Sequence, residues 1–169
     1  PEKIQRNLEA IIEATNRSGN LTQQLLAFAR KQTISPQILI LNDAVESTLK
    51  MLRRLIGENI DLCWLPSNER GSINIDPAQI TQILTNLCIN AKDSIVGVGK
   101  IIISTKKYTI SKSDDESRQP GLYIELTVKD SGEGISETDM LNIFEPFFTT
   151  KEPGKGTGLG LATVHGIIT

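Results

Sequence analysis

The chain has 169 residues, of which 38% are apolar, and a formal net charge of −2. That length fits one ordinary domain with a helical appendage, and the weak charge argues against a nucleic-acid partner. No run approaches the roughly 20 apolar residues of a membrane helix, and Cys63 and Cys88 lack metal-ligand spacing. We therefore expect a soluble protein of a reducing compartment, with both cysteines acting as small buried apolar residues.

Residues 1–32 predict one long helix with an apolar stripe. Ile4, Ile11 and Leu25 follow a seven-residue spacing, and Pro36 ends the helix because proline disfavours helical geometry in the preceding residue. An apolar stripe of this length needs a partner. It fits either packing on the helix's own domain or a bundle or dimer seam of the coiled-coil kind.

A short strand and a helix follow. Residues 37–41 predict the strand, and Asn42 or Asp43 should cap the helix, with Glu46 completing a capping box. Gly57 should stop this helix. Its apolar positions, which keep helical spacing and should face the core, are Val45, Leu49, Leu52 and Ile56.

Two short strands, residues 59–65 and 71–75, precede a longer helix over residues 77–96. Asp76 is its expected N-cap, followed by proline at the first helical position. The positions expected to form its core face are Ile80, Leu84, Leu87, Ala91 and Ile95.

A second stripe of the same helix is polar. Asn86, Asn90 and Asp93 stand at helical spacing on a different face. Amide oxygens are hard, neutral ligands suited to Mg²⁺, which keeps several waters and takes further oxygens from substrate phosphates. A solvated polar face would show the same spacing, so the spacing alone does not decide between a site and a surface.

Two long strands are predicted over residues 100–110 and 122–129, which are rich in β-branched residues. The charged segment between them, residues 111–121, should be a surface connection. The second strand delivers Asp130 to its end. Ser136 should cap a short helix with Asp139 at the third position.

Asp130 lies at the start of a glycine-containing segment, DSGEGI (130–135). Gly132 and Gly134 can bend the chain around a flat base because glycine reaches φ > 0. A carboxylate only accepts hydrogen bonds, so it could take them from an exocyclic amine such as that of adenine. Guanine presents a carbonyl at that edge and would be repelled.

A second glycine run, Gly156-Thr-Gly158-Leu-Gly160, opens an apolar helix whose N-terminus should attract phosphate. The run lacks the Lys-Ser/Thr of a P-loop and the preceding strand of a dinucleotide-binding fold. Either glycine run alone fits an ordinary turn. Together they predict a nucleotide pocket in which different loops hold the base and the phosphates.

An aromatic segment lies between the two runs and contains Phe144, Phe147 and Phe148, of which at least one should pack in the core. Thr149, Thr150, Lys151 and Lys155 border a short loop, where a lysine could meet a phosphate as a point charge or remain solvated. The only histidine, His165, lies in the final helix. It is expected at or near the surface rather than as a phosphoacceptor.

Four segments together resemble the catalytic, ATP-binding domain of sensor histidine kinases. DSGEGI (130–135) resembles the G1 box, IFEPFFTTK (143–151) the F box, GKGTGLGLATV (154–164) the G2 box and NLCINAKDS (86–94) the N box. The resemblance covers about residues 18–168. It implies an α+β fold, the two-layer α/β sandwich of Bergerat type shared with gyrase, Hsp90 and MutL ATPases, preceded by a long N-terminal helix.

The resemblance also implies roles for individual residues. It makes Asn90 the magnesium ligand and Asn86 a contact to a phosphate or to the metal's water shell, both serving catalysis. It makes Asp130 the residue that binds adenine. The remaining nucleotide-binding positions that it implies are Asp93, Gly132, Gly134, Ile135, Phe144, Phe148, Thr149, Lys151, Lys155, Gly156, Thr157, Gly158, Leu159, Gly160 and Leu161. Many of these kinases carry a lysine where this chain has Asp93.

The resemblance divides the chain into two parts. Residues 1–34, containing NLTQQLLAFARKQ (20–32), are similar to the second helix of the dimerisation and phosphotransfer hairpin. Residues 35–169 correspond to the catalytic domain without the last two strands of related kinases. A homodimer through the N-terminal helix is expected, with no nucleic-acid partner. The expected location is the cytoplasm, with a membrane anchor an option for the full-length protein.

The implied activity is that of a protein-histidine kinase that uses ATP and Mg²⁺. The γ-phosphoryl group would pass to a histidine on a phosphoacceptor helix upstream of this chain, and then to an aspartate of a response regulator.

Two other functions are retained. One is an ATPase of the gyrase or Hsp90 kind, in which a glutamate four residues before the magnesium asparagine activates water. Asn86 stands at that position here, and an amide cannot take the proton near pH 7. The other is a nucleotide-binding scaffold that no longer transfers phosphate.

Overall fold

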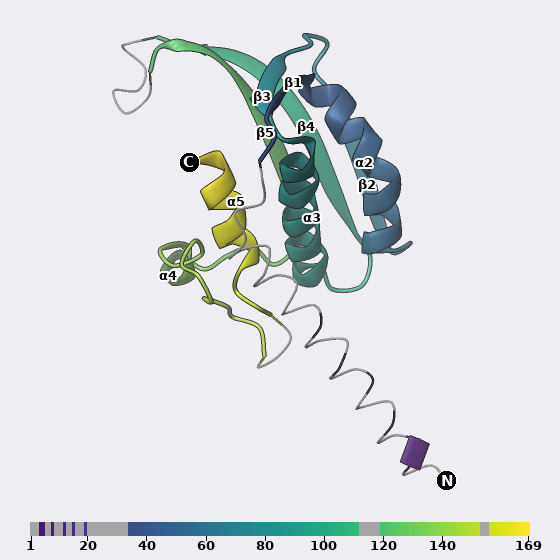
Figure 1. Ribbon diagram of the computed structural model, residues 1–169. Helices are drawn as coiled ribbons and strands as arrows, with labels where there is room; N and C mark the ends of the chain where they lie inside the picture. Colours follow the sequence, from purple (N-terminus) through teal and green to yellow (C-terminus); the bar gives the residue numbers. More distant parts are fainter. Residues whose placement is uncertain are drawn as a thin grey trace.

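The computed structural model describes residues 34–111, 119–152 and 156–169, together with Ile4, Gln5, Leu8, Ile12, Thr15 and Gly19 (Figure 1). Those six N-terminal positions are helical. Most of the helix expected over residues 1–32, most of the connection 111–121 and Lys155 lie outside the described residues. The part of the chain that is described contains no helix long and apolar enough to cross a membrane.

The strands form two separate sheets. β2 (Ile60–Leu65), β4 (Gly99–Ile110) and β5 (Gly121–Asp130) make a sheet in the order β2-β4-β5, in which β2 and β4 are parallel and β4 and β5 antiparallel. β1 (Gln37–Ile40) pairs antiparallel with β3 (Ser72–Ile75). The predicted strands and the α+β class are therefore confirmed.

Helices cover one face of the three-stranded sheet. α2 (Leu41–Ile56) and α3 (Pro77–Ser94) lie side by side on it, α5 (Gly160–Ile168) lies beside α3, and α4 (Glu137–Met140) is a single turn further out (Figure 1). The core between helices and sheet is apolar because apolar residues recur about every 3.6 residues along the helices and every second residue along the strands, which places them on the faces that meet. Its most buried members are Val45, Leu52, Leu84, Cys88, Ile101 and Ile103.

The predicted capping box of α2 is wrong. The helix begins earlier, at Leu41, which precedes both expected caps, and its actual N-cap, Ile40, makes no side-chain hydrogen bond. Asn42 is instead buried, where its amide donates to the Ser67 carbonyl at 3.0 Å and accepts from the Thr105 hydroxyl at 2.8 Å. Glu46 accepts a bond from the Trp64 indole. Tertiary partners thus take the groups that a local cap would have used.

The N-terminus of α3 is as predicted. Asp76 is the N-cap, its carboxylate accepts from the Ala78 N–H, and Pro77 takes the first helical position. The predicted C-terminus is two residues too late, because the helix ends at Ser94 and Ile95 is its C-cap. That end carries Asp93 and Ser94, which line a cavity.

One member of the predicted core face of α3 is also wrong. Leu87 is only partly buried and lines a cavity, whereas Cys88 is fully buried in the core. Burial raises the pKa of the Cys88 thiol to about 11, because desolvation disfavours the thiolate. Cys63, which was expected to be buried, is partly exposed and lies 3.4 Å from an Asp61 oxygen.

Candidate functional site

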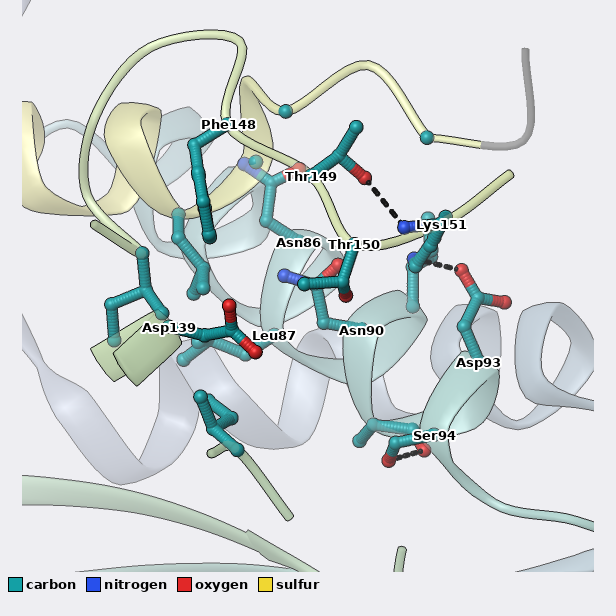
Figure 2. A pocket seen from close by; sticks show the side chains of 18 of the residues that line it. Asn86, Leu87, Asn90, Asp93, Ser94, Asp139, Phe148, Thr149, Thr150 and Lys151 are labelled. Atoms are coloured by element: carbon teal, nitrogen blue, oxygen red, sulfur yellow. Dashed lines mark hydrogen bonds and ion pairs between the residues drawn. The ribbon is translucent and has the colours of Figure 1, made fainter. Parts of the chain in front are cut away.

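A cavity of about 520 Å³ opens between α3, the end of β5 and the segment that leads into α5. Figure 2 shows Asn86 and Asn90 projecting from α3 toward the stretch that carries Phe148, Thr149 and Thr150. The predicted site residues that line this cavity are Asn86, Asn90, Asp93, Asp130, Gly134, Ile135, Phe148, Thr149, Lys151, Gly156, Thr157, Gly158, Gly160 and Leu161.

Of the predicted site residues that the structure describes, three do not line the cavity. Gly132 donates its N–H to Asp130, and Leu159 is buried with 3% of its surface exposed. Phe144 packs on His165, with the ring centroids 5.0 Å apart. Phe144 and Phe147 are exposed, and Phe148 lines the cavity. The prediction that at least one of the three packs in the core is therefore wrong.

Several lining residues were not assigned from the sequence. They include the polar residues Ser94, Glu133, Ser136, Asp139 and Thr150, and the apolar residues Leu87, Ile89, Ala91, Val128 and Ile143. Ser94 had a usable signal, because it directly follows the polar stripe at the end of α3. The predicted cap at Ser136 is confirmed, since its hydroxyl accepts from the Asp139 N–H at 3.1 Å.

The two asparagines are half-buried, and their side-chain amides make no hydrogen bond to another described residue. An amide has two donors and an acceptor with two lone pairs, so each carries unused bonding capacity into the cavity. Gly160 lies next to them, so that an added Cβ would be 3.6 Å from Asn90 Nδ2 and 3.9 Å from Asn86 Cβ. The amide oxygens suit a hard cation, and the amide N–H groups suit the oxygen atoms of a ligand.

Asp130, the last residue of β5, is fixed through one oxygen. Its Oδ1 accepts from the Gly132 N–H at 2.8 Å and lies 3.3 Å from the Ser94 hydroxyl. Its Oδ2 has no hydrogen-bond partner among the described residues. The β5 end is itself held to β4 by the Ser131 N–H, which donates to the Lys100 carbonyl at 3.1 Å.

The described residues 148–152 and 156–157, together called the lid, are flanked by a backbone contact between Phe147 and Gly158. The Phe147 N–H donates to the Gly158 carbonyl at 3.0 Å, and both residues have positive φ, 70° and 65°. An added Cβ at Gly158 would overlap the Phe147 backbone, so only glycine allows this approach. Gly156 likewise packs closely on Thr149 and Lys151.

One ion pair connects the lid to α3. Lys151 Nζ lies 2.5 Å from Asp93 Oδ2, and Figure 2 shows the pair at one side of the cavity. The two side chains remain 32% and 37% exposed. Lys151, predicted to meet a phosphate or solvent, is thus neutralised by a carboxylate in this structure.

Comparison with known proteins identifies a family for more than half of the chain. Residues 75–169 match the family described as "Histidine kinase-, DNA gyrase B-, and HSP90-like ATPase". The sensor kinase CckA of Brucella abortus is 38% identical over 161 residues, which are 94% of this chain and 17% of CckA. The chain spans between 17% and 32% of the length of the first curated relatives that it matches.

Solved structures of histidine kinases share the fold. The catalytic domain of the histidine kinase ThkA superposes with a TM-score of 0.60 at 30% identity, covering 79% of this chain and 79% of that domain. ThkA in complex with the response regulator protein TrrA gives a TM-score of 0.66 at 26% identity, covering 89% of this chain and 42% of ThkA.

Proposed function

This chain belongs to the family of histidine kinase-, DNA gyrase B- and HSP90-like ATPases, and from that premise we propose that it is the ATP-binding catalytic region of a sensor histidine kinase. The γ-phosphoryl group of ATP passes to a histidine outside these 169 residues and then to an aspartate of a response regulator. The similarity to CckA and to ThkA, solved with its response regulator, supports this proposal.

The observation that supports the proposal is that one cavity is lined both by the Asp130 carboxylate and by Gly160 at the start of α5. Asp130 meets the end of α3 at Ser94, while Asn86 lies about 12 Å back along that helix by the rise per residue. Gly160, the first residue of α5, lies next to Asn86 and Asn90. A ligand with an amine at one end and phosphates at the other matches a cavity with a carboxylate at one end and amides and a helix N-terminus at the other.

The residues present fit a magnesium ion at the phosphate end. Asn90 would hold it directly, and Asn86 would contact a phosphate or the ion's water shell, because both amides are free to bond into the cavity. When bound, the ion neutralises charge that develops on the phosphate oxygens. Asn86 and Asn90 orient the phosphates, and the N–H groups at the start of α5 bind their oxygens.

Transfer to another group is favoured over hydrolysis because of the residue four positions before Asn90. That residue is Asn86, and an amide cannot act as a general base near pH 7. The chain's own histidine is a poor acceptor, since His165 packs against Phe144 and is not among the cavity residues. The accepting imidazole therefore comes from another helix.

The remaining parts of the proposal concern assembly. Residues 1–34 are the second helix of a dimerisation and phosphotransfer hairpin, and residues 35–169 are the catalytic domain. Ile4, Leu8 and Ile12 fall on one helical stripe and are more than half exposed, which suits a seam with a second copy of the chain. ATP is a cytoplasmic substrate, so this region works in the cytoplasm.

Labelling with γ-phosphate tests the proposal. The full-length protein that contains this chain should take up acid-labile, base-stable phosphate from ATP, while the 169-residue chain should bind ATP and take up none. Asn90→Ala should abolish magnesium-dependent ATP binding with the fold retained, and Asn74→Ala, an exposed asparagine on β3, is the control. Rapid ATP hydrolysis without labelling would indicate an ATPase, and binding without either reaction would indicate a scaffold.

A further inference from the structure

The last residue of α3 contacts the carboxylate that is proposed to bind the base. Ser94 Oγ lies 3.3 Å from Asp130 Oδ1, and the Gly132 N–H donates to that same oxygen at 2.8 Å. Oδ1 therefore has the Gly132 N–H as a full donor and the Ser94 hydroxyl as a shared one, whereas Oδ2 has none among the described residues. The carboxylate is held by one oxygen and leaves the other for a ligand.

Backbone contacts keep Ser94 at this place. The Glu133 N–H donates to the Ser94 carbonyl at 3.2 Å, which ties the loop after β5 to the end of α3. Gly132 packs directly on the Ser94 side chain, and an added Cβ at Gly132 would overlap Ser94 Oγ. Glycine at position 132 is thus needed for the serine to approach Asp130.

The hydroxyl of Ser94 has one proton and two acceptors. It also lies 2.8 Å from the Ala91 carbonyl, in the i−3 position of its own helix. The bond to Ala91 fixes the side-chain rotamer and the contact with Asp130 is the longer of the two. The effect of removing the hydroxyl should accordingly be several-fold and not many orders of magnitude.

We propose that Ser94 is a positioning residue for adenine recognition. With the Gly132 N–H, it occupies Oδ1 of Asp130 and so directs Oδ2 to the 6-amino group of the bound base. The inference rests on the proposed function, because it takes the ligand to be an adenine nucleotide. It adds that the selectivity of the pocket depends on a serine that does not itself bond the base.

Binding of two nucleotides separates positioning from a merely structural role. ATP carries the 6-amino group, and purine riboside triphosphate lacks it. Ser94→Ala should lower the affinity for ATP about three- to tenfold, the range of an ordinary hydrogen bond, because the hydroxyl proton is shared with the Ala91 carbonyl. It should leave the affinity for purine riboside triphosphate unchanged, so that the ratio of the two dissociation constants moves toward one.

Ser47→Ala is a matched control. Ser47 lies on the exposed face of α2 and bonds the Ala44 carbonyl at 2.7 Å, in the same i−3 geometry but away from the cavity. It should change neither affinity. Calorimetric titration of the 169-residue chain measures both nucleotides for the wild type and the two variants.

Each other outcome overturns the inference in a recognisable way. Equal weakening of both nucleotides by Ser94→Ala would assign the hydroxyl a structural role only. An unchanged ratio with intact adenine preference in the wild type would refute the role of Ser94 and leave the proposed function standing. A wild-type chain without preference for ATP would contradict the proposed function and the inference together.

Discussion

The two ends of the cavity are built differently. At the end proposed to hold the base, called the base end, Asp130 terminates a strand paired with β4, and its neighbours Gly132 and Glu133 bond to the strand end or to α3. At the end proposed to hold the phosphates, called the phosphate end, the described lid residues are held by the Phe147–Gly158 backbone contact and by the Lys151–Asp93 ion pair, whose side chains are about a third exposed.

The difference indicates where selectivity and adaptability reside. Groups fixed before binding lose little conformational entropy when the ligand arrives, so the base end can discriminate between bases. A partly exposed ion pair contributes at most about 1 kcal/mol, so a charged ligand can readily replace it. We expect variants at the base end to change selectivity, and variants in the lid to change affinity with the number of phosphates.

Among the variants that compare the two ends, the largest effect should come from Gly158, because its φ of +65° and the adjacent Phe147 backbone both exclude a side chain. Gly158→Ala should lower ATP affinity about 100-fold, since regaining the loop conformation would cost about 2.7 kcal/mol. Gly134→Ala is the comparison at the base end, where φ is +78° but the space is open. It should cost about tenfold. Equal losses, measured by calorimetry, would show that the Phe147 contact is unimportant.

Asp130→Asn should come next. Loss of a charge-assisted hydrogen bond should weaken ATP binding about 10- to 30-fold, while affinity for purine riboside triphosphate should hardly change. The amide oxygen can still accept from the Gly132 N–H, so the melting temperature should be retained. A variant that binds ATP as the wild type does would remove Asp130 from the base site.

The ion pair of the lid should have a smaller effect. Lys151→Met removes a cation and leaves Asp93 unpaired at the cavity, so ATP affinity should fall about three- to tenfold, ADP affinity less, and adenosine affinity not at all. Asp93→Asn frees Lys151 and should raise ATP affinity a few-fold. Both differences should shrink in high salt. Equal changes for ATP and adenosine would contradict a phosphate-directed role.

The smallest effect concerns Asp76, which caps the helix that both ends share. Backbone N–H groups of Ser35 and Ala78 bond its carboxylate and lower its pKa from the ordinary value. Because the pKa of this carboxyl is lower in the folded state than in the unfolded state, the ionised group stabilises the fold at pH values above the unfolded-state pKa. This stabilisation is lost as the pH falls through the folded-state pKa. Asp76→Asn should therefore melt a few degrees lower at pH 7, with the difference closing below about pH 4. Nucleotide selectivity should not change.

Local patterns predicted the elements well where one residue type decides the geometry. Asp76-Pro77 started α3, Gly57 ended α2, and Asp130 ended β5 as expected. The α2 cap failed because Asn42 found tertiary partners, Ser67 and Thr105, that are distant in sequence. Periodicity tolerates a shift of one residue, which is why Leu87 was assigned to the core face of α3, although Cys88 was correctly expected to be buried.

The motifs predicted most residues of the candidate site but not how they pair. Asp93 and Lys151 were both expected at the nucleotide, yet their mutual ion pair joins positions 58 residues apart, which no local pattern encodes. Ser94 follows the polar stripe of α3, but its pairing could not be read from that pattern. Its contact with Asp130 depends on how the end of α3 meets the end of β5, and the helix was predicted to continue beyond it.

A crystal structure of the chain with Mg²⁺ and a non-hydrolysable ATP analogue tests most directly whether the cavity holds ATP in the proposed orientation. We expect the 6-amino group of adenine at about 3 Å from Asp130 Oδ2, with the terminal phosphates between Asn90 and the N–H groups that open α5. A base seated under the lid, with the phosphates toward Asp130 or outside the cavity, would contradict the proposal.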